Sequence, residues 1–359
     1  MSRTTVYNKC LADENLIADD VTVHTRTTAW SAALSGLLII TVIASAGIGP
    51  VAIPPVTVTY ILIDSVIPLL AYPIEQPLRT IVIDIRLPRI VLAGLVGFAL
   101  ASAGTVMQGF FRNPMADPSI IGVSSGAAVG AVATIILPLS LPVGIELQGA
   151  AFITALLTAF AVYLIATRNG ETPTATLLLA GVAVQTFLGA VISFMLLFSG
   201  KSLRRVVYWL MGHLGGTTWT DVEAAILIVP PVFAGLLFYT HELNVLLLGE
   251  KDASAIGVEV ERTKRILLTA ASIITATAVA VTGVIGFVGL IVPHVMRLLV
   301  GPDHRILLPT SALAGASFLV ATDTLARSGA VEVPVGIVTA ALGAPFFLYL
   351  LRRQEVTRL

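Results

Sequence analysis

Charged side chains are scarce in this chain of 359 residues. Asp, Glu, Lys and Arg make up 12% of it and hydrophobic residues 56%, whereas soluble domains carry about 25% charged residues. This scarcity excludes an ordinary soluble domain, and the mean hydropathy of +0.95 indicates a membrane protein. The formal net charge is zero, so no overall field attracts nucleic acid. We expect a lipid bilayer around the chain and no nucleic-acid partner.

Cysteine is nearly absent as well. The single Cys10 lies in a polar N-terminal segment, which excludes an internal disulfide and a cysteine metal cluster. Neither G-x-x-x-x-G-K-[ST] nor G-x-G-x-x-G occurs, so the chain carries no recognisable phosphate-binding loop. We expect no metal site, no bound cofactor and no catalytic residue, and any nucleotide chemistry would belong to a partner.

Long apolar runs recur along the whole chain. Runs of about 17 to 25 residues are long enough to cross a bilayer as helices, and they predict an all-α polytopic membrane protein with about ten transmembrane helices. The predicted spans are 30–48, 88–107, 119–138, 148–167, 175–197, 223–240, 265–283, 285–300, 306–325 and 334–351. The proline-rich segment 49–87 is a poor uninterrupted span. We expect it to form an external loop with a short surface helix.

The distribution of basic residues predicts the orientation. Residues 1–29 have neither the basic start nor the cleavage site of a signal peptide, and we interpret them as a cytosolic tail. Most Lys and Arg residues then fall in the inner segments, as the positive-inside rule requires. An even number of spans in the domain 30–352 returns the C-terminal tail, 353–359, to the cytosol.

The second predicted span carries a stripe of small residues. Gly94, Gly97, Ala101 and Gly104 recur at steps of three and four, so they share one face of the helix. Small residues let membrane helices approach closely, and helix packing without any transport role explains the stripe. Gln108, near the end of this helix, is a candidate for lining a polar pathway or for packing.

The next motif, at residues 111–127, contains one Asn-Pro step and one Asp-Pro step. Proline restricts the residue before it, so Asn113 and Pro114 predict a rigid, non-helical connector. The connector is either a cytosolic hairpin or irregular backbone that lines a cavity.

The same motif contains Gly122, Ser124 and Gly126, which match the G-x-S-x-G nucleophile elbow. That motif requires a strand, a turn and a helix in succession, and no strand is predicted here. An intramembrane serine hydrolase with His294 as its base is therefore a distant alternative.

The longest charged inner loop spans residues 243–265. Within it, Gly249 and Gly257 bound a short stretch that is helical in character and too polar to cross the bilayer. Short helices on the cytosolic face would make a docking surface for a soluble subunit, and the alternative is a solvated loop.

A series of motifs in fixed order extends over residues 30–352. They are "RLPR" (86–89), "GTVMQGFFRNPMADPSIIGVSSGA" (104–127), "LLLAGVA" (177–183), "GEKDASAIG" (249–257), "GFVGLIVPHVMR" (286–297), "DHRILLP" (303–309) and "EVPVGIVTAALGAPFFLYLL" (332–351). In these motifs the chain resembles the FecCD-type permeases of ABC importers for cobalamin, haem and ferric siderophores. The resemblance implies a multi-pass permease of the cytoplasmic (inner) membrane that pairs with a second copy of itself. Two cytosolic ABC ATPase subunits, which bind ATP and Mg, and one external substrate-binding protein would complete the importer.

The resemblance also implies a role for the outward arginines. Arg86, Arg89 and Arg327 would form pockets for acidic residues of the binding protein, because guanidinium groups bind carboxylates bidentately. Two alternatives remain. The arginines would anchor helix ends at the headgroups, or Arg327 would pair with Asp323 four residues earlier on its helix.

At the inner face, the resemblance implies a gate and a coupling element. Thr174, in the loop before "LLLAG", corresponds to the cytoplasmic gate. The residues of the glycine-bounded stretch would form coupling helices that dock in a cleft of the ATPase. They are Gly249, Glu250, Ala253, Ile256 and Gly257.

The substrate is indicated by one stretch only. "YWLMGHLGGTTW" (208–219) is closer to the form of cobalamin permeases than to that of siderophore permeases, which favours cobalamin over a ferric siderophore or haem. An ion-coupled secondary transporter is the rival class. It should bury ionisable residues near the membrane midplane, and the predicted span centres lack obvious Asp, Glu, Lys or Arg.

Overall fold

The computed structural model describes residues 3–67, 75–137, 146–329 and 331–353. Within these ranges the chain is helical, and the one extended pairing joins Arg168 and Glu171. Seven of the described helices are long and apolar enough to cross a membrane, and three shorter apolar helices accompany them. The predicted all-α polytopic fold is therefore confirmed.

Fifteen α-helices make up the described chain, with shorter π and 3-10 segments between some of them. They are α1 (Arg3–Gly47), α2 (Pro55–Val66), α3 (Gln76–Thr80), the π-helical segment Ile81–Arg86, α4 (Leu87–Phe110), the 3-10 helix Pro118–Ile121, α5 (Val123–Ile136), α6 (Glu146–Ala166), α7 (Thr174–Leu197), the 3-10 helix Gly200–Ser202, α8 (Leu203–Leu210), α9 (Trp219–Leu237), α10 (Thr240–Leu246), α11 (Glu250–Ala255), α12 (Val260–Thr282), α13 (Val288–Val300), α14 (His304–Arg327) and α15 (Val335–Arg353).

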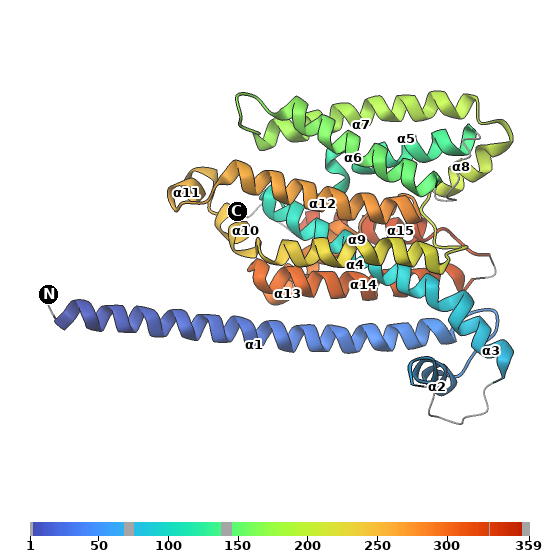
Figure 1. Cartoon of the computed structure of the whole chain (residues 1–359), viewed down its shortest axis with the longest axis horizontal. Coiled ribbons are helices and arrows are strands. Elements are labelled where there is room, and N and C mark those ends of the chain that lie inside the picture. Colours follow the sequence, from blue (N-terminus) through green and yellow to red (C-terminus); the bar gives the residue numbers. More distant parts are fainter. Residues whose placement is uncertain (1–2, 68–74, 138–145, 330, 354–359) are drawn as a thin grey trace.

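Helix α4 forms the centre of the bundle. It packs against α9, α12, α13 and α14, and most of its membrane-crossing window is buried inside the chain. Helices α5, α6 and α7 form a second group that packs on α12, whereas α1 lies along α14 on the opposite side (Figure 1). The central position of α4 explains why its second half consists mainly of small and apolar residues.

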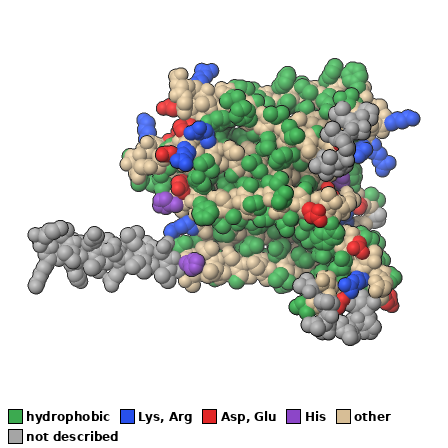
Figure 2. All heavy atoms as spheres, viewed as in Figure 1, with side chains coloured by type: hydrophobic (Ala, Val, Ile, Leu, Met, Phe, Trp, Pro, Cys, Tyr) green, Lys and Arg blue, Asp and Glu red, His purple; other side chains and the backbone are tan. Residues whose placement is uncertain are grey.

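The two ends of the bundle differ in what they carry. The first turns of α1 and the last turn of α15 lie at the same end as α10 and α11, and α2 and α3 lie at the other end (Figure 1). Charged side chains gather at these two ends, with a largely apolar band between them (Figure 2). This distribution suits a protein whose apolar band contacts lipid, because charged side chains are costly inside the hydrocarbon layer.

The second span begins earlier than predicted. Helix α3, the π-helical segment and α4 form one continuous span from Gln76 to Phe110, so the predicted external loop 49–87 loses its last residues to a helix. Pro77 does not break this helix because it lies in the first turn, where backbone N–H groups have no helical partner. The π-helical segment directly precedes Pro88, where a regular α-helical turn would press the ring against a carbonyl.

The N-terminal region is also more helical than predicted. Helix α1 starts at Arg3, so residues 3–29 of the predicted tail form one continuous helix with the first span rather than a separate segment. The rest of loop 49–87 contains α2, which agrees with the predicted short helix. The C-terminal tail, 353–359, lies outside the described residues apart from its first.

The glycine stripe of α4 brings backbones into contact. A Cβ atom on Gly97 would lie 2.2 Å from the carbonyl oxygen of Gly315 in α14, and one on Gly104 would lie 1.9 Å from that of Gly289 in α13. Gly94 is different, since its Cβ would meet only a side-chain carbon at 3.8 Å. The stripe therefore serves close helix packing, as predicted, and fixes α13 and α14 against α4.

Candidate functional site

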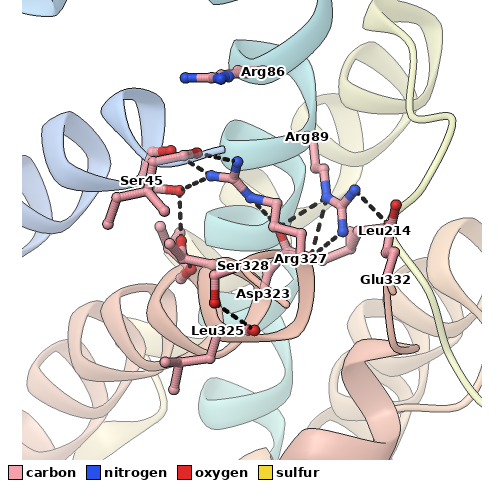
Figure 3. Close-up of polar contacts among 12 residues, drawn as sticks. Ser45, Arg86, Arg89, Leu214, Asp323, Leu325, Arg327, Ser328 and Glu332 are labelled. Carbon is pink, nitrogen blue, oxygen red and sulfur yellow. Dashed lines mark hydrogen bonds and ion pairs between the residues drawn. The ribbon is translucent and has the colours of Figure 1, made fainter. Parts of the chain in front are cut away.

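One cluster of charged residues lies at the end of the bundle near α2 and α3. Arg89 of α4 binds Asp323 of α14 bidentately, with Nε to Oδ2 at 2.9 Å and Nη2 to Oδ1 at 2.7 Å (Figure 3). Its Nη1 donates to Glu332 Oε1 at 2.7 Å. The Asp323 side chain is 1% exposed and that of Arg89 14%, whereas Glu332 is 43% exposed. Arg89 thus binds carboxylates of the chain itself, whereas carboxylates of an external protein were expected from the sequence.

Arg327 and Arg86 hold the C-terminal end of α1. Arg327 donates through Nη1 to the carbonyl of Ile48 at 2.7 Å and through Nη2 to Ser45. Its Nε lies 3.6 Å from Asp323 Oδ2, which confirms the pair expected four residues apart. Arg86 is buried and donates to the carbonyls of Ala46 and Val51. The bonds to Ser45 and Ala46 supply partners for carbonyls that α1 leaves unpaired where it ends, and those to Ile48 and Val51 hold the segment that follows α1.

The open arginine pockets expected from the sequence are therefore filled in this structure. Arg86 is a buried structural residue, and Arg89 and Arg327 are engaged with groups of α1, α14 and the segment before α15. Docking of an external protein at these arginines stays a prediction. Of the two carboxylates on Arg89, Glu332 is the more exposed, so a carboxylate of an external protein would replace Glu332 more readily than Asp323.

The stretch that indicated cobalamin lies at the same end. Gly212 adopts φ +68°, and a Cβ there would lie 2.3 Å from the carbonyl oxygen of Val284; a Cβ on Gly283 would lie 2.1 Å from that of Trp209. Gly212 of this motif thus serves backbone packing. A polar cavity of about 390 Å³ beside it is lined by Arg205, Tyr208 and His213, among others.

His213 links this cavity to the charged cluster. Its ring stacks at a tilt against Tyr208, with centroids 4.7 Å apart. Burial lowers the pKa of His213; the nearby Glu332 opposes that shift, and Arg89 adds to it. The imidazole is therefore neutral at physiological pH, because the shift is downward from a value already below 7.

The opposite end of the bundle carries the predicted coupling element. Gly249 and Gly257 adopt φ values of +118° and +98°, and they bound α11 as predicted. Ala253 faces the protein interior and Ile256 is 65% exposed. Helices α10 and α11 thus form an ordered surface at this end, which contradicts a shapeless solvated loop.

The predicted gate residue lies next to the coupling element. Thr174 is the first residue of α7, and its Oγ1 lies 3.4 Å from Oε1 of Glu250 in α11. Glu250 also lines an open cavity of about 970 Å³, which Glu171 and Lys251 border as well. The structure therefore brings together two predicted site residues that the sequence separates by 76 positions.

Gln108 lies in the last turn of α4, and Asn113 and Pro114 lie in the turn that follows it. Gln108 is 1% exposed, and its Nε2 donates to the carbonyl of Leu290 in α13 at 2.9 Å, so it joins helices within the chain. The side chain of Asn113 accepts a bond from the backbone N–H of Met115 at 2.9 Å, and the half-buried Pro114 lies between them. Residues 111–117 form a non-helical connector, as predicted, and the 3-10 helix Pro118–Ile121 follows it.

The hydrolase alternative lacks its structural context. The 3-10 helix Pro118–Ile121, not a strand, precedes Gly122, which adopts φ +85° as the N-cap of α5. A Cβ on Gly126 would lie 2.3 Å from Thr158 Oγ1 of α6. The small residues of this motif therefore serve the contact between α5 and α6.

Sequence reasoning missed a polar joint between α10 and α14. Asn244 donates to Asp303 at 2.7 Å and accepts from the backbone N–H of His304 at 2.8 Å. Burial of Asp303 would raise its pKa, but bonds from Arg305 and Asn244 outweigh burial and lower it. The Asp303 side chain also caps α14. The sequence could have indicated Asp303, because an Asp directly before an apolar helix is typical of an N-cap. No local pattern indicates that Asn244 of α10 is its partner.

Comparisons with known proteins agree with this architecture. A family model described as the FecCD transport family matches residues 37–353. The cobalamin import system permease protein BtuC of Halobacterium salinarum is 54% identical, over 93% of this chain and 98% of its own length. The hemin transport system permease protein HmuU of Yersinia pestis is 45% identical, over 77% of this chain and 84% of its own length. A solved structure, described as an inward-facing metal-chelate type ABC transporter, matches with a TM-score of 0.76 and 33% identity, over 90% of this chain and 99% of that one.

Proposed function

The chain belongs to the FecCD transport family and is a membrane permease of an ABC transporter, and on that premise we propose that it carries cobalamin across the cytoplasmic membrane into the cell. The observation that carries the proposal is the 54% identity, over nearly the whole of both chains, to a relative named for cobalamin import. The match extends over 93% of this chain.

Haem or a ferric siderophore is the second candidate substrate. The relative named for hemin transport is 45% identical but matches a smaller share of this chain. A broad pathway between helices binds a large solute weakly, so selection among such solutes would fall to an external binding protein. Cobalamin takes precedence because the more similar relative, with nearly full coverage, bears that name.

The proposed assembly contains two copies of this chain, two cytosolic ABC ATPase subunits and one external substrate-binding protein. ATP and Mg would bind to the ATPase subunits. Helix α7 supports pairing of the permeases, since it packs on α5 and α6 and exposes Leu179, Phe187 and Leu197 on its free side. Both termini would lie in the cytosol together with α10 and α11.

Each end of the bundle would have one docking role. At the external end, Arg89 and Arg327 would receive carboxylates of the binding protein, and Arg86 would hold the end of α1 in place beneath them. At the cytosolic end, the exposed Ile256 would enter a cleft of the ATPase while the buried Ala253 keeps α11 seated. Charge complementarity outside would set orientation more than affinity.

Uptake by the reconstituted transporter tests the proposal. The permease, its ATPase and its binding protein are placed in proteoliposomes, and labelled cobalamin is compared with haem and a panel of ferric siderophores. The proposal predicts ATP-dependent accumulation of cobalamin. Accumulation of a ferric chelate instead would keep the importer class and overturn the substrate.

A further inference from the structure

Lys264, near the start of α12, is a buried cation whose donors are all in use. Its side chain is 3% exposed. The ammonium lies 2.8 Å from Glu250 Oε2, 3.0 Å from Glu261 Oε1 and 3.0 Å from the carbonyl oxygen of Thr172. A lysine ammonium has three donors, so these contacts saturate it. They join three separate segments of the chain at one atom.

The acceptors of Lys264 are themselves bound to the segment that precedes α7. The second oxygen of Glu261 accepts the backbone N–H of Thr172 at 3.2 Å. The second oxygen of Glu250 lies 3.4 Å from the hydroxyl of Thr174. Helix α11, the first turn of α12 and residues 172–174 therefore form a closed ring of hydrogen bonds around Lys264.

The segment before α7 is a tight turn. Arg168 and Glu171 exchange both backbone hydrogen bonds, at 2.9 and 3.0 Å, and Asn169 and Gly170 both adopt positive φ values, +54° and +84°. Two consecutive residues of this kind are typical of a two-residue hairpin turn. The hydroxyl of the buried Thr172 is also bound to that of Thr167 at the end of α6. We expect a turn held by these hydrogen bonds to move as one rigid unit.

We propose that Lys264 is a positioning residue that locks the turn before α7 to helix α11, so that a displacement of α11 carries the predicted gate residue Thr174 with it. The inference rests on the proposed function, because it explains how movement of α11 by the ATPase would reach the gate of the translocation pathway. Lys264 itself touches neither nucleotide nor substrate in this account.

The chemistry of the ring suits a lock better than a hinge. Lys264 faces two carboxylates, and a charged hydrogen bond inside a protein is stronger and shorter than a neutral one. An exposed pair on the same turn of α12 offers a contrast, since Arg262 and Glu259 lie 3.3 Å apart with both side chains largely in solvent. Such surface pairs contribute little to the positions of the elements that bear them.

Two substitutions open the ring from different sides. Glu250→Gln keeps the size of a half-buried side chain and removes one charge, so it leaves the fold intact. Lys264→Met removes the ammonium group that binds all three acceptors. Arg262→Gln on the same helical turn is the matched control, because it breaks only the exposed pair. The conservative variant Lys264→Arg keeps a cation that can donate to both carboxylates and to the Thr172 carbonyl.

The first measurement follows the lock in the full permease in nanodiscs. Cys10 is replaced by Ser, and spin labels are attached at Glu171 and Lys251, two exposed residues on the turn and on α11. Electron paramagnetic resonance should give one narrow distance distribution in the parent and in Arg262→Gln. It should broaden in Glu250→Gln and in Lys264→Met, and stay narrow in Lys264→Arg. A parent-like distribution in both Glu250→Gln and Lys264→Met would overturn the proposal.

The second measurement asks whether the lock transmits motion. With the ATPase and binding protein present, Glu250→Gln should lower uptake per ATP hydrolysed by about tenfold, the scale of one lost charge-assisted hydrogen bond. Lys264→Arg, which keeps the cation, should retain a ratio close to that of the parent, whereas Lys264→Met should lose it. The distance measurement needs no substrate or ATPase. A lock that holds in a protein without cobalamin uptake would therefore refute the proposed substrate and leave this inference standing.

Discussion

Removal of the Asp323 carboxylate tests the internal clamp at the external end. Its side chain is 1% exposed, it accepts two hydrogen bonds from Arg89, and it lies 3.6 Å from Arg327. Asp323→Leu leaves two guanidinium groups close together without the carboxylate between them. Breaking a buried ion pair by removal of one partner costs about 3–5 kcal/mol. We expect a loss near 3 kcal/mol, because Glu332 still neutralises part of the charge on Arg89.

Thermal unfolding of the detergent-solubilised permease measures this loss, which should lower Tm by several degrees. Glu332→Gln is the control, since its side chain is 43% exposed and exposed pairs are worth about 0–1 kcal/mol. The double variant Arg89→Met with Asp323→Leu should recover part of the stability, because it removes both charges. The reasoning is refuted if Asp323→Leu is no more harmful than Glu332→Gln, or if the double variant loses the sum of both single effects.

Three further substitutions test packing, capping and backbone conformation. Gly104→Ala should cost about 1–3 kcal/mol, because its Cβ would lie 1.9 Å from a backbone oxygen of α13, while Gly94→Ala, with 3.8 Å of space, should be neutral in the same unfolding assay. Asp303→Ala should cost about 1 kcal/mol through its lost cap. Because bonds from Arg305 and Asn244 lower its pKa, this difference should be present above about pH 4 and vanish as the pH falls through the folded-state pKa. Gly257→Val forces a β-branched residue to φ +98°, a strain of about 1–3 kcal/mol, and should lower uptake per ATP in proteoliposomes; unchanged coupling would show that α11 needs no special backbone angle there.

Much of the fold follows from local sequence patterns. Apolar runs of membrane-crossing length predicted the spans, because lipid requires each backbone polar group to be bonded within the segment. The glycines at 249 and 257 predicted the limits of α11, because positive φ favours glycine. The glycine stripe predicted close packing of α4, although only the structure shows that Gly315 and Gly289 are its partners.

The long-range partners of the charged residues did not follow from the sequence. Arg89 and Asp323 are 234 positions apart, and no local pattern states that α4 and α14 bring them together. An outward arginine next to a span suggests an external partner as readily as an internal one. The burial of Lys264 has no local signal either, because it depends on the contact between α11 and the start of α12.

The energy source of transport tests the central claim most directly. Proteoliposomes are prepared with the permease, its ATPase and its binding protein, and labelled cobalamin is added on the side of the binding protein. Accumulation is measured with and without ATP at the ATPase face, and in the presence and absence of proton and sodium ionophores. The account predicts accumulation above the external concentration only with ATP, and no effect of the ionophores. Accumulation driven by an imposed ion gradient without ATP or the ATPase would contradict it.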